Sequence, residues 1–116
     1  MKNTELLKGT LSTLILRLLS EHSRLYGYEI TQLVKERSKE KILIKEGSLY
    51  PALHKLEADG LVESEEVFIG KRVRRYYKLT QPGKKATLMY IEELSDFLKT
   101  MEQLILPFPT AYVPAK

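Results

Sequence analysis

Residues 47–62 of the chain read Gly47-Ser48-Leu49-Tyr50-Pro51-Ala52-Leu53-His54-Lys55-Leu56-Glu57-Ala58-Asp59-Gly60-Leu61-Val62. Four apolar residues recur in this segment every three or four positions, at Leu49, Ala52, Leu53 and Leu56. That spacing puts them on one side of a helix and leaves the polar side chains on the rest of its surface. A helix that begins near Gly47 keeps Pro51 within its first turn, and Gly60 suits the left-handed residue that ends a helix. The segment therefore predicts a short helix with one apolar face and one presented face.

A basic hairpin is predicted directly after this helix. Residues 61–69 and 72–79 are candidate strands joined through Gly70-Lys71, and a two-residue connection with Gly first is typical of a type II′ turn. This register pairs Glu66 with Arg75, an ion pair worth ~0.2–1 kcal/mol. Residues 67–78 carry five positive charges and no negative one, namely Lys71, Arg72, Arg74, Arg75 and Lys78. In a chain of net charge +4, this block predicts contact with a polyanion.

The remaining N-terminal elements look like a mount for the helix and the hairpin. Residues 4–20 and 26–38 predict two helices, and the first carries a broad apolar stripe. Ile42-Leu43-Ile44 is too short for a helix and is expected to form a short strand that pairs with the hairpin. A helix followed by a basic hairpin is suited to reading DNA, and together the elements predict such a DNA-reading unit on a helical mount.

The last predicted helix opens at Thr80-Gln81-Pro82-Gly83, where Thr80 can cap it, and runs to about Leu106. Its apolar residues repeat in a heptad-like pattern, which predicts pairing across a two-fold axis. Packing on the chain's own first helix is the rival interpretation, and the stripe is wide enough for both. Leu6 and Leu16 could also face a partner. The predicted dimer interface comprises Leu6, Tyr90, Ile91, Leu94, Phe97, Leu98, Met101, Leu104 and Ile105.

Four motifs stand in order along the chain. They are Gly9-x-Leu11 with the leucine-rich run to Leu19, Tyr26-Gly27-Tyr28-Glu29-Ile30, the segment 47–53 with Lys55-Leu56-Glu57 and Gly60-Leu61, and Arg74-Arg75-Tyr76-Tyr77-Lys78-Leu79-Thr80 with Gly83. With these motifs the chain resembles the PadR family of bacterial transcriptional regulators over residues 5–106. The resemblance implies a winged-helix DNA-binding fold, a homodimer, and usually repression that a ligand or a modification relieves.

The resemblance also implies that some short members, which have a single C-terminal helix, bind flat aromatic compounds between the paired helices. A small aromatic effector is therefore a candidate partner. The resemblance implies that aromatic side chains line such pockets, in one version a tryptophan on the last helix. This chain has no tryptophan. Tyr90 and Phe97 could line a pocket, although their helical spacing alone favours a core position.

The predicted DNA contacts come from three places: the second helix, the presented helix with its approach, and the hairpin tip. They are Tyr28, Lys45, Ser48, Tyr50, His54, Lys55, Lys71, Arg72 and Arg74. Tyr28 could equally be a half-exposed packing residue, and an ordinary solvated hairpin tip is the alternative for the last three. Arg75 is excluded because its predicted partner is Glu66.

Catalysis has little basis in this sequence. His22 and His54 lie on different elements and the chain has no cysteine, so a zinc site is unsupported. No phosphate loop, nucleophile elbow or paired-carboxylate pattern occurs. Neither a cofactor nor an enzymatic activity is expected. No apolar run approaches the ~20 residues of a membrane span, and residues 1–5 do not begin a signal peptide.

The predicted fold is mainly α with a small β-hairpin (α+β). It comprises a winged helix-turn-helix over residues 1–80, one long C-terminal dimerisation helix over residues 81–106 and a Pro-rich tail over residues 107–116. Phe108, Tyr112 and Val113 in this tail either stay disordered or dock on the dimer. The predicted function is that of a cytoplasmic, sequence-specific DNA-binding regulator, a repressor that binds a pseudo-palindromic operator as a homodimer. The alternative is a winged-helix protein-interaction module that works through its apolar C-terminal helix.

Overall fold

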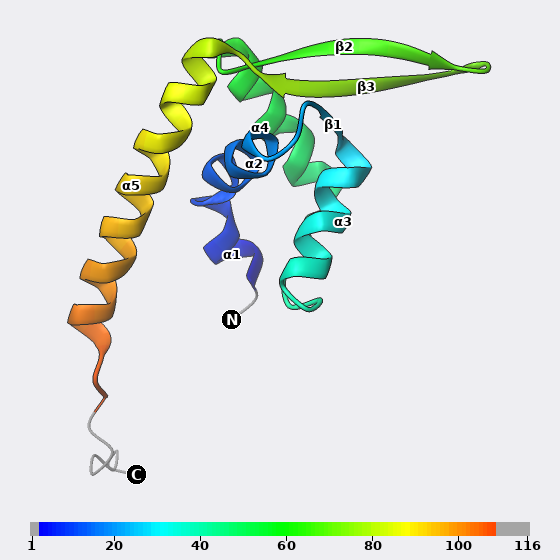
Figure 1. The fold of residues 1–116 in the computed structure, drawn as a ribbon. Coiled ribbons are helices and arrows are strands. Elements are labelled where there is room, and N and C mark those ends of the chain that lie inside the picture. The colour runs from blue at the N-terminus through cyan, green and yellow to red at the C-terminus, as the bar shows by residue number, and fades with distance from the viewer. Residues whose placement is uncertain (1–2, 109–116) are drawn as a thin grey trace.

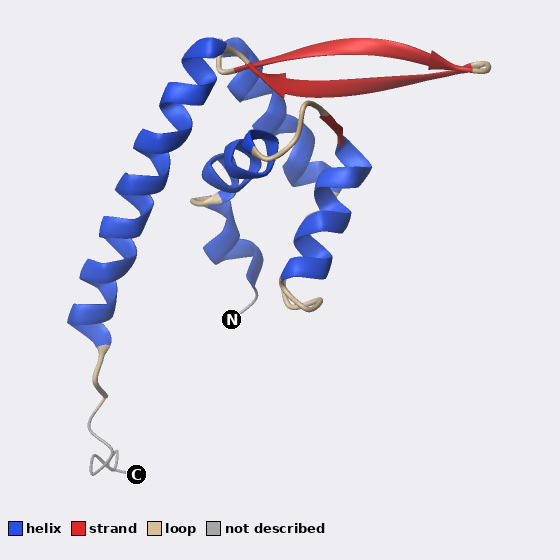
Figure 2. Ribbon diagram, in the orientation of Figure 1, coloured by secondary structure: helices blue, strands red, loops and turns tan. Residues whose placement is uncertain are grey.

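The computed structural model describes residues 3–108, with side chains from Leu6 onward. The chain forms, in order, the elements α1 (Asn3–Lys8), α2 (Leu11–Ser20), β1 (Leu25–Tyr26), α3 (Gly27–Arg37), α4 (Glu46–Ala58), β2 (Val62–Ile69), β3 (Arg72–Leu79) and α5 (Gln81–Ile105). The strands make one antiparallel sheet of order β1-β3-β2, which lies beside the helices (Figure 1, Figure 2). This is the helix-rich winged architecture that the sequence predicts.

The core lies between α2, α3, α4 and the base of the sheet. Of the predicted apolar face of α4, Leu49, Leu53 and Leu56 are buried and Ala52 is half-buried against the same core. They belong to one cluster with buried side chains from the other elements, including Ile15, Leu16, Leu19, Ile30, Val62 and Tyr77. Burial also raises the pKa of the Tyr77 hydroxyl. Each large apolar side chain buried here contributes about 1.5–3 kcal/mol, so the cluster fixes α4 against the sheet.

The hairpin of β2 and β3 has the predicted register. Glu66 lies opposite Arg75, and Phe68 lies opposite Val73. Gly70 takes a positive φ of 62° at the first turn position, as a type II′ connection requires. The predicted ion pair is formed, with Arg75 Nη2 at 2.6 Å from Glu66 Oε1. The hairpin projects well beyond the helices as the wing of the fold (Figure 1).

The predicted first helix over residues 4–20 is wrong as a single element, because the chain breaks it into α1 and α2. At the break, the Thr10 backbone N–H donates to the Leu7 carbonyl at 2.9 Å, and the Thr10 hydroxyl donates to the same oxygen at 3.0 Å. Gly9 has low helix propensity and threonine competes locally for backbone carbonyls, so a turn wins here. Leu16 is fully buried in the core, so it does not face a partner, whereas Leu6 is exposed.

The third strand is also not the predicted one. Leu25–Tyr26 pairs with β3, whereas Ile42-Leu43-Ile44 is a loop that leads into α4. Lys39 and Glu40 take left-handed backbone conformations, with φ of 53° and 63°, and the Ser38 hydroxyl accepts the Ile42 N–H at 3.0 Å. This tight turn brings the chain directly to α4, with Ile44 buried and Leu43 exposed, and leaves the edge of β3 to β1.

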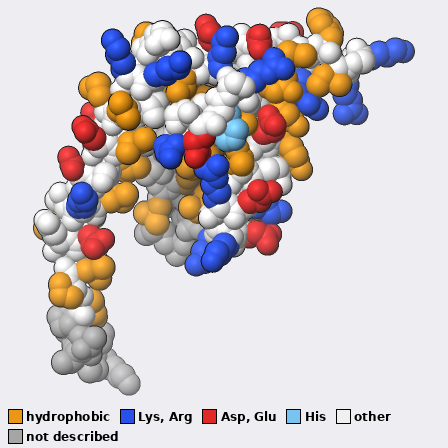
Figure 3. Space-filling model, in the orientation of Figure 1, with side chains coloured by type: hydrophobic (Ala, Val, Ile, Leu, Met, Phe, Trp, Pro, Cys, Tyr) orange, Lys and Arg blue, Asp and Glu red, His pale blue; other side chains and the backbone are white. Residues whose placement is uncertain are grey.

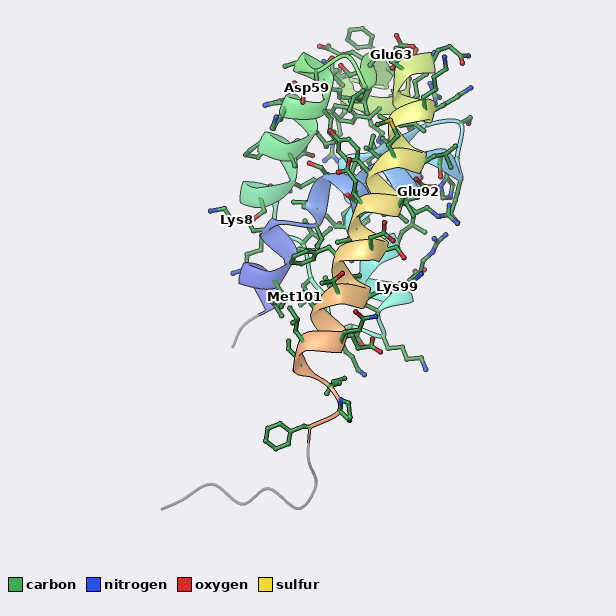
Figure 4. The ribbon with its side chains drawn as sticks, turned by 90° about the vertical axis from the view of Figure 1, so that its left-hand side faces the viewer. Lys8, Asp59, Glu63, Glu92, Lys99 and Met101 are labelled. Carbon is green, nitrogen blue, oxygen red and sulfur yellow. The ribbon has the colours of Figure 1, made fainter. Side chains whose placement is uncertain are left out.

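Helix α5 follows the predicted bounds closely. Its first half packs on α2, with Thr87 buried, and its second half diverges from α2 and ends beyond α1 (Figure 1). Figure 4 shows Glu92, Lys99 and Met101 spaced along its length. Over residues 3–108 no helix is both long enough and apolar enough to cross a membrane. Tyr112 and Val113 of the tail lie outside the described residues, and the division into domains stays a prediction.

Thr80 joins the wing to α5, and its replacement by alanine is expected to destabilise the fold by about 1–2 kcal/mol. The Thr80 hydroxyl oxygen accepts the Gly83 N–H at 3.0 Å and donates to the Gly60 carbonyl at 2.6 Å. Thr80→Ser keeps both bonds and is the matched control. Urea unfolding of the two variants checks this, and equal loss in both would show that the hydroxyl contributes nothing.

Candidate nucleic-acid interface

The presented face of α4 is polar and open, as predicted. Ser48, His54 and Lys55 are exposed, while the leucines on the other side of the helix are buried. Lys55 Nζ lies 3.2 Å from Asp59 Oδ2, an exposed pair one turn apart that leaves the ammonium group accessible. Lys45 is exposed at the N-cap of α4.

Tyr50 is the residue of this helix that the structure places differently. Its side chain is half-buried and packs against the core, and its hydroxyl lies beside Gly27, the first residue of α3. A Cβ on Gly27 would come within 2.5 Å of the Tyr50 hydroxyl oxygen, so glycine permits the close approach. Tyr50 therefore braces α4 against α3, and its predicted DNA contact stays a prediction.

Two grooves are lined by seven of the nine predicted DNA contacts. The first has a volume of about 470 Å³ between α3, α4 and the wing, and four predicted residues line it: Tyr28, Tyr50, Arg72 and Arg74. The second has a volume of about 680 Å³ between α1, α2 and the start of α4, and it holds Lys45, Ser48 and Lys55. Residues from the start of α4 line both grooves, so the N-terminal end of this helix lies between the two groups of predicted contacts. His54 and Lys71 line neither groove.

The five cations of residues 67–78 have three kinds of surroundings in the structure. Arg75 and Lys78 pair with Glu66 and Glu63 across the hairpin, at 2.6 and 3.4 Å. Lys71 and Arg72 are exposed at the tip, and within the described part of the chain neither forms an ion pair. Figure 3 shows blue Lys and Arg side chains at the far end of the wing. The open positive charge therefore concentrates at the tip.

Arg74, the fifth cation, is held by aromatic rings. Its guanidinium carbon lies 4.1 Å from the centroid of the Tyr26 ring, and Nη1 donates to the Tyr76 hydroxyl at 3.5 Å. This hydrogen bond raises the pKa of Arg74 above its ordinary value. Sequence patterns do not predict these contacts, because they depend on the pairing of β1 with β3, and a two-residue strand shows no periodicity.

The predicted dimer-interface residues fall into two groups. Tyr90, Ile91, Leu94 and Met101 are half-buried, and Tyr90 packs against the core. The others are exposed, namely Leu6, Phe97, Leu98, Leu104 and Ile105. In the half-buried group, Tyr90 thus packs within its own chain, as the rival interpretation of the α5 stripe expects. The exposed group lies on α1 and on the C-terminal half of α5.

Comparisons of the sequence with known proteins point to one family of transcriptional regulators. The model of the Transcriptional regulator PadR-like family matches residues 15–88. The chain is 36% identical over 96 residues to an uncharacterized protein X of Lysinibacillus sphaericus, covering 81% of this chain and 83% of that protein. It is 44% identical over 54 residues to Transcriptional regulator Rv3488 of Mycobacterium tuberculosis, covering 47% and 50%.

Solved structures give the same result. A transcriptional regulator from Clostridium thermocellum matches with a TM-score of 0.80 and 32% identity, over 87% of this chain and 98% of that one. A PadR family transcriptional regulator from Eggerthella lenta matches with a TM-score of 0.77 and 28% identity, over 90% and 89%. The family is one of transcriptional regulators rather than enzymes. On the family model, the relatives and the shared winged-helix fold, this chain belongs to the PadR-like family of DNA-binding transcriptional regulators.

Proposed function

We propose that this regulator is a cytoplasmic repressor that binds a pseudo-palindromic operator as a homodimer. In each protomer α4 enters the major groove and the wing lies along the flanking DNA. The observation that carries the proposal is a pair of exposed cations at the wing tip, Lys71 and Arg72, which form no ion pair with any described residue, together with the polar presented face of α4. Cations of this kind bind phosphate or enter the minor groove, while the side chains of a major-groove helix read base edges.

On α4 the exposed residues suit base and phosphate recognition. His54 and Ser48 each offer hydrogen-bonding groups, and Lys55 adds a cation. Lys45 precedes the first turn of α4, where the helix dipole also favours a phosphate. Tyr28 is 63% exposed near the start of α3, where its hydroxyl can reach the DNA backbone.

The dimer is proposed from the distal half of α5. Leu98 and Ile105 continue the stripe of Ile91 and Leu94, yet they are 55% and 59% exposed in the single chain. A second copy would bury this surface. Two wings related by a two-fold axis then demand half-sites about one helical turn apart, ~34 Å, which accounts for a palindromic operator.

A small aromatic compound is the effector class that we propose. Tyr90 and Phe97 line a shallow groove of about 300 Å³ between α5 and the start of α2, together with Ser12 and Leu94. In a dimer this groove would lie near the paired helices, so a flat ligand there could change their spacing. Binding of such a compound would release the operator.

Removing the two tip cations is expected to weaken binding to every DNA sequence. Lys71→Gln with Arg72→Gln should lower affinity by about 10–100-fold at ~0.1 M salt and reduce the slope of log K against log salt by ~1.8. Fluorescence anisotropy with random and operator duplexes measures both quantities. The control is Lys85→Gln with Lys99→Gln, which removes the same charge from α5.

An unchanged salt slope in the tip variant would overturn the role of the wing. A wild-type dimer that is retained neither on heparin nor on mixed DNA at low salt would favour the alternative, a protein-interaction module that works through α5. The exposed apolar half of α5 is the surface that such a module would use.

A further inference from the structure

Four side chains form a continuous stack between the start of α3 and the wing. The Arg24 guanidinium lies 4.0 Å from the centroid of the Tyr76 ring, Tyr76 meets Tyr26 edge to face at 5.4 Å, and Arg74 covers Tyr26 at 4.1 Å. At the far end Arg24 Nη1 lies 2.7 Å from Glu65 Oε1 on β2. We name the four residues Arg24, Tyr76, Tyr26 and Arg74 the Arg–Tyr stack.

We propose that Arg74 is a positioning residue for DNA binding, which holds the wing at a fixed angle to α3 and α4 through the Arg–Tyr stack. The proposal rests on the proposed function of the wing. Arg74 then acts through Lys71 and Arg72 rather than by its own contact with phosphate.

The topology makes such a device necessary. β1 is two residues long and pairs with β3 only at Leu25–Tyr77 and Tyr26–Tyr76. Beyond Tyr76 the hairpin runs toward its tip with β2 as the one strand beside β3 among the described residues. A two-stranded ribbon is twisted and pliable on its own, so its outer part needs side-chain contacts with the body. Arg74 provides the next contact outward from the last paired residue.

The stack also reaches α3, the helix that carries the proposed backbone contact Tyr28. Tyr26 is the N-cap of α3, and its N–H donates to the Glu29 carboxylate at 3.1 Å. The ring that Arg74 covers is therefore fixed to the first turn of α3. Through Tyr26 and Tyr76, the position of the wing is tied to the helix pair that presents α4.

The chemistry requires arginine at this position. A planar guanidinium stacks on an aromatic face and still directs an N–H to a hydroxyl, here that of Tyr76. A lysine would keep the charge but lose the planar contact. Arg75, its neighbour, is on the opposite face of the strand and pairs with Glu66, so it is a matched control outside the stack.

Arg74→Lys and Arg74→Gln distinguish positioning from direct contact. Positioning predicts that both variants lose affinity alike, by about 10–100-fold, and that the salt slope falls by ~1.8, the amount due to Lys71 and Arg72. In the Lys71→Gln, Arg72→Gln background, Arg74→Lys should then change affinity by less than about twofold. Arg75→Lys should bind DNA as the wild type does.

A direct phosphate contact gives another pattern and overturns the proposal: Arg74→Lys binds as the wild type, and Arg74→Gln lowers the salt slope by only ~0.9. Backbone NMR relaxation of the free protein is the readout independent of DNA. Arg74→Lys should make residues 67–73 more mobile than in the wild type while residues 11–20 stay unchanged, and equal mobility would overturn the proposal. If the wild type fails to bind DNA, the proposed function fails, and the relaxation experiment still decides whether Arg74 holds the wing.

Discussion

Replacing Gly83 by alanine is expected to destabilise the folded chain by about 2–4 kcal/mol. Gly83 is buried in the first turn of α5, where the helix crosses the chain that leads into β2. A Cβ at this position would overlap the Leu61 carbonyl oxygen and lie 2.9 Å from the carbonyl carbon. Both atoms belong to backbone, so no side-chain rotation can relieve the overlap.

The surroundings of Gly83 also cannot move freely. The Leu61 carbonyl accepts the Thr80 N–H at 3.1 Å, and the Leu61 N–H donates to the Leu56 carbonyl at 3.0 Å. Relief of the overlap would therefore shift the end of α4 or the start of α5. Because α5 carries the proposed dimer surface, a displaced start would also change how far apart two wings lie.

Gly47→Ala is the control for this prediction. An added Cβ on Gly47 meets nothing within 4 Å, and alanine favours a helix over glycine by roughly 0.5–1 kcal/mol, so this variant should be as stable as the wild type or slightly more so. Urea unfolding gives both free energies. If Gly83→Ala proved as stable as the wild type, the close contact between α5 and Leu61 would not require glycine at residue 83.

The second large effect is expected from charges placed in the distal stripe of α5. Leu98→Glu with Ile105→Glu should give a monomer, because two carboxylates from each protomer would have to be buried in the dimer. Loss of the second half-site should lower affinity for the whole operator by ~10²–10⁴-fold. Affinity for an isolated half-site should not change, since neither residue lies on α4 or the wing. Sedimentation and anisotropy measurements on the same samples test both expectations.

Thr100→Glu with Gln103→Glu is the matched control, since it adds the same charge at exposed polar positions of the same helix. This control should remain a dimer and keep its affinity. A dimer that survives Leu98→Glu with Ile105→Glu would place the interface elsewhere, and Leu6 on α1 and Leu104 beside the stripe on α5 would be the next residues to change.

The elements that sequence alone predicted correctly are those with strong local signals. The leucine spacing of α4, the Gly70-Lys71 turn and the Thr80 cap each depend on residues close together in the chain, and each is present in the structure. A turn type fixes hairpin register, so the Glu66–Arg75 pair followed from the same two residues.

The features that were missed depend on distant parts of the chain. β1 has two residues, too few to show any period, and only its fit against β3 makes Leu25–Tyr26 a strand. The stack of Arg74 on Tyr26 joins residues 48 positions apart. Tyr50 has a polar hydroxyl and lies outside the leucine stripe, so it was predicted to be presented, but the close approach at Gly27 draws it inward. Tertiary packing decided each of these positions.

Sedimentation equilibrium of the purified protein, with and without random-sequence duplex DNA at about 50 mM salt and then at rising salt, tests the dimeric DNA-binding proposal as a whole. The predicted result is a dimer that binds the duplex at low salt and releases it steeply as salt rises. A monomer would remove the paired α5 helices and with them the palindromic operator. A dimer that ignores DNA at low salt would contradict the assignment of α4 and the wing as the DNA-binding surface.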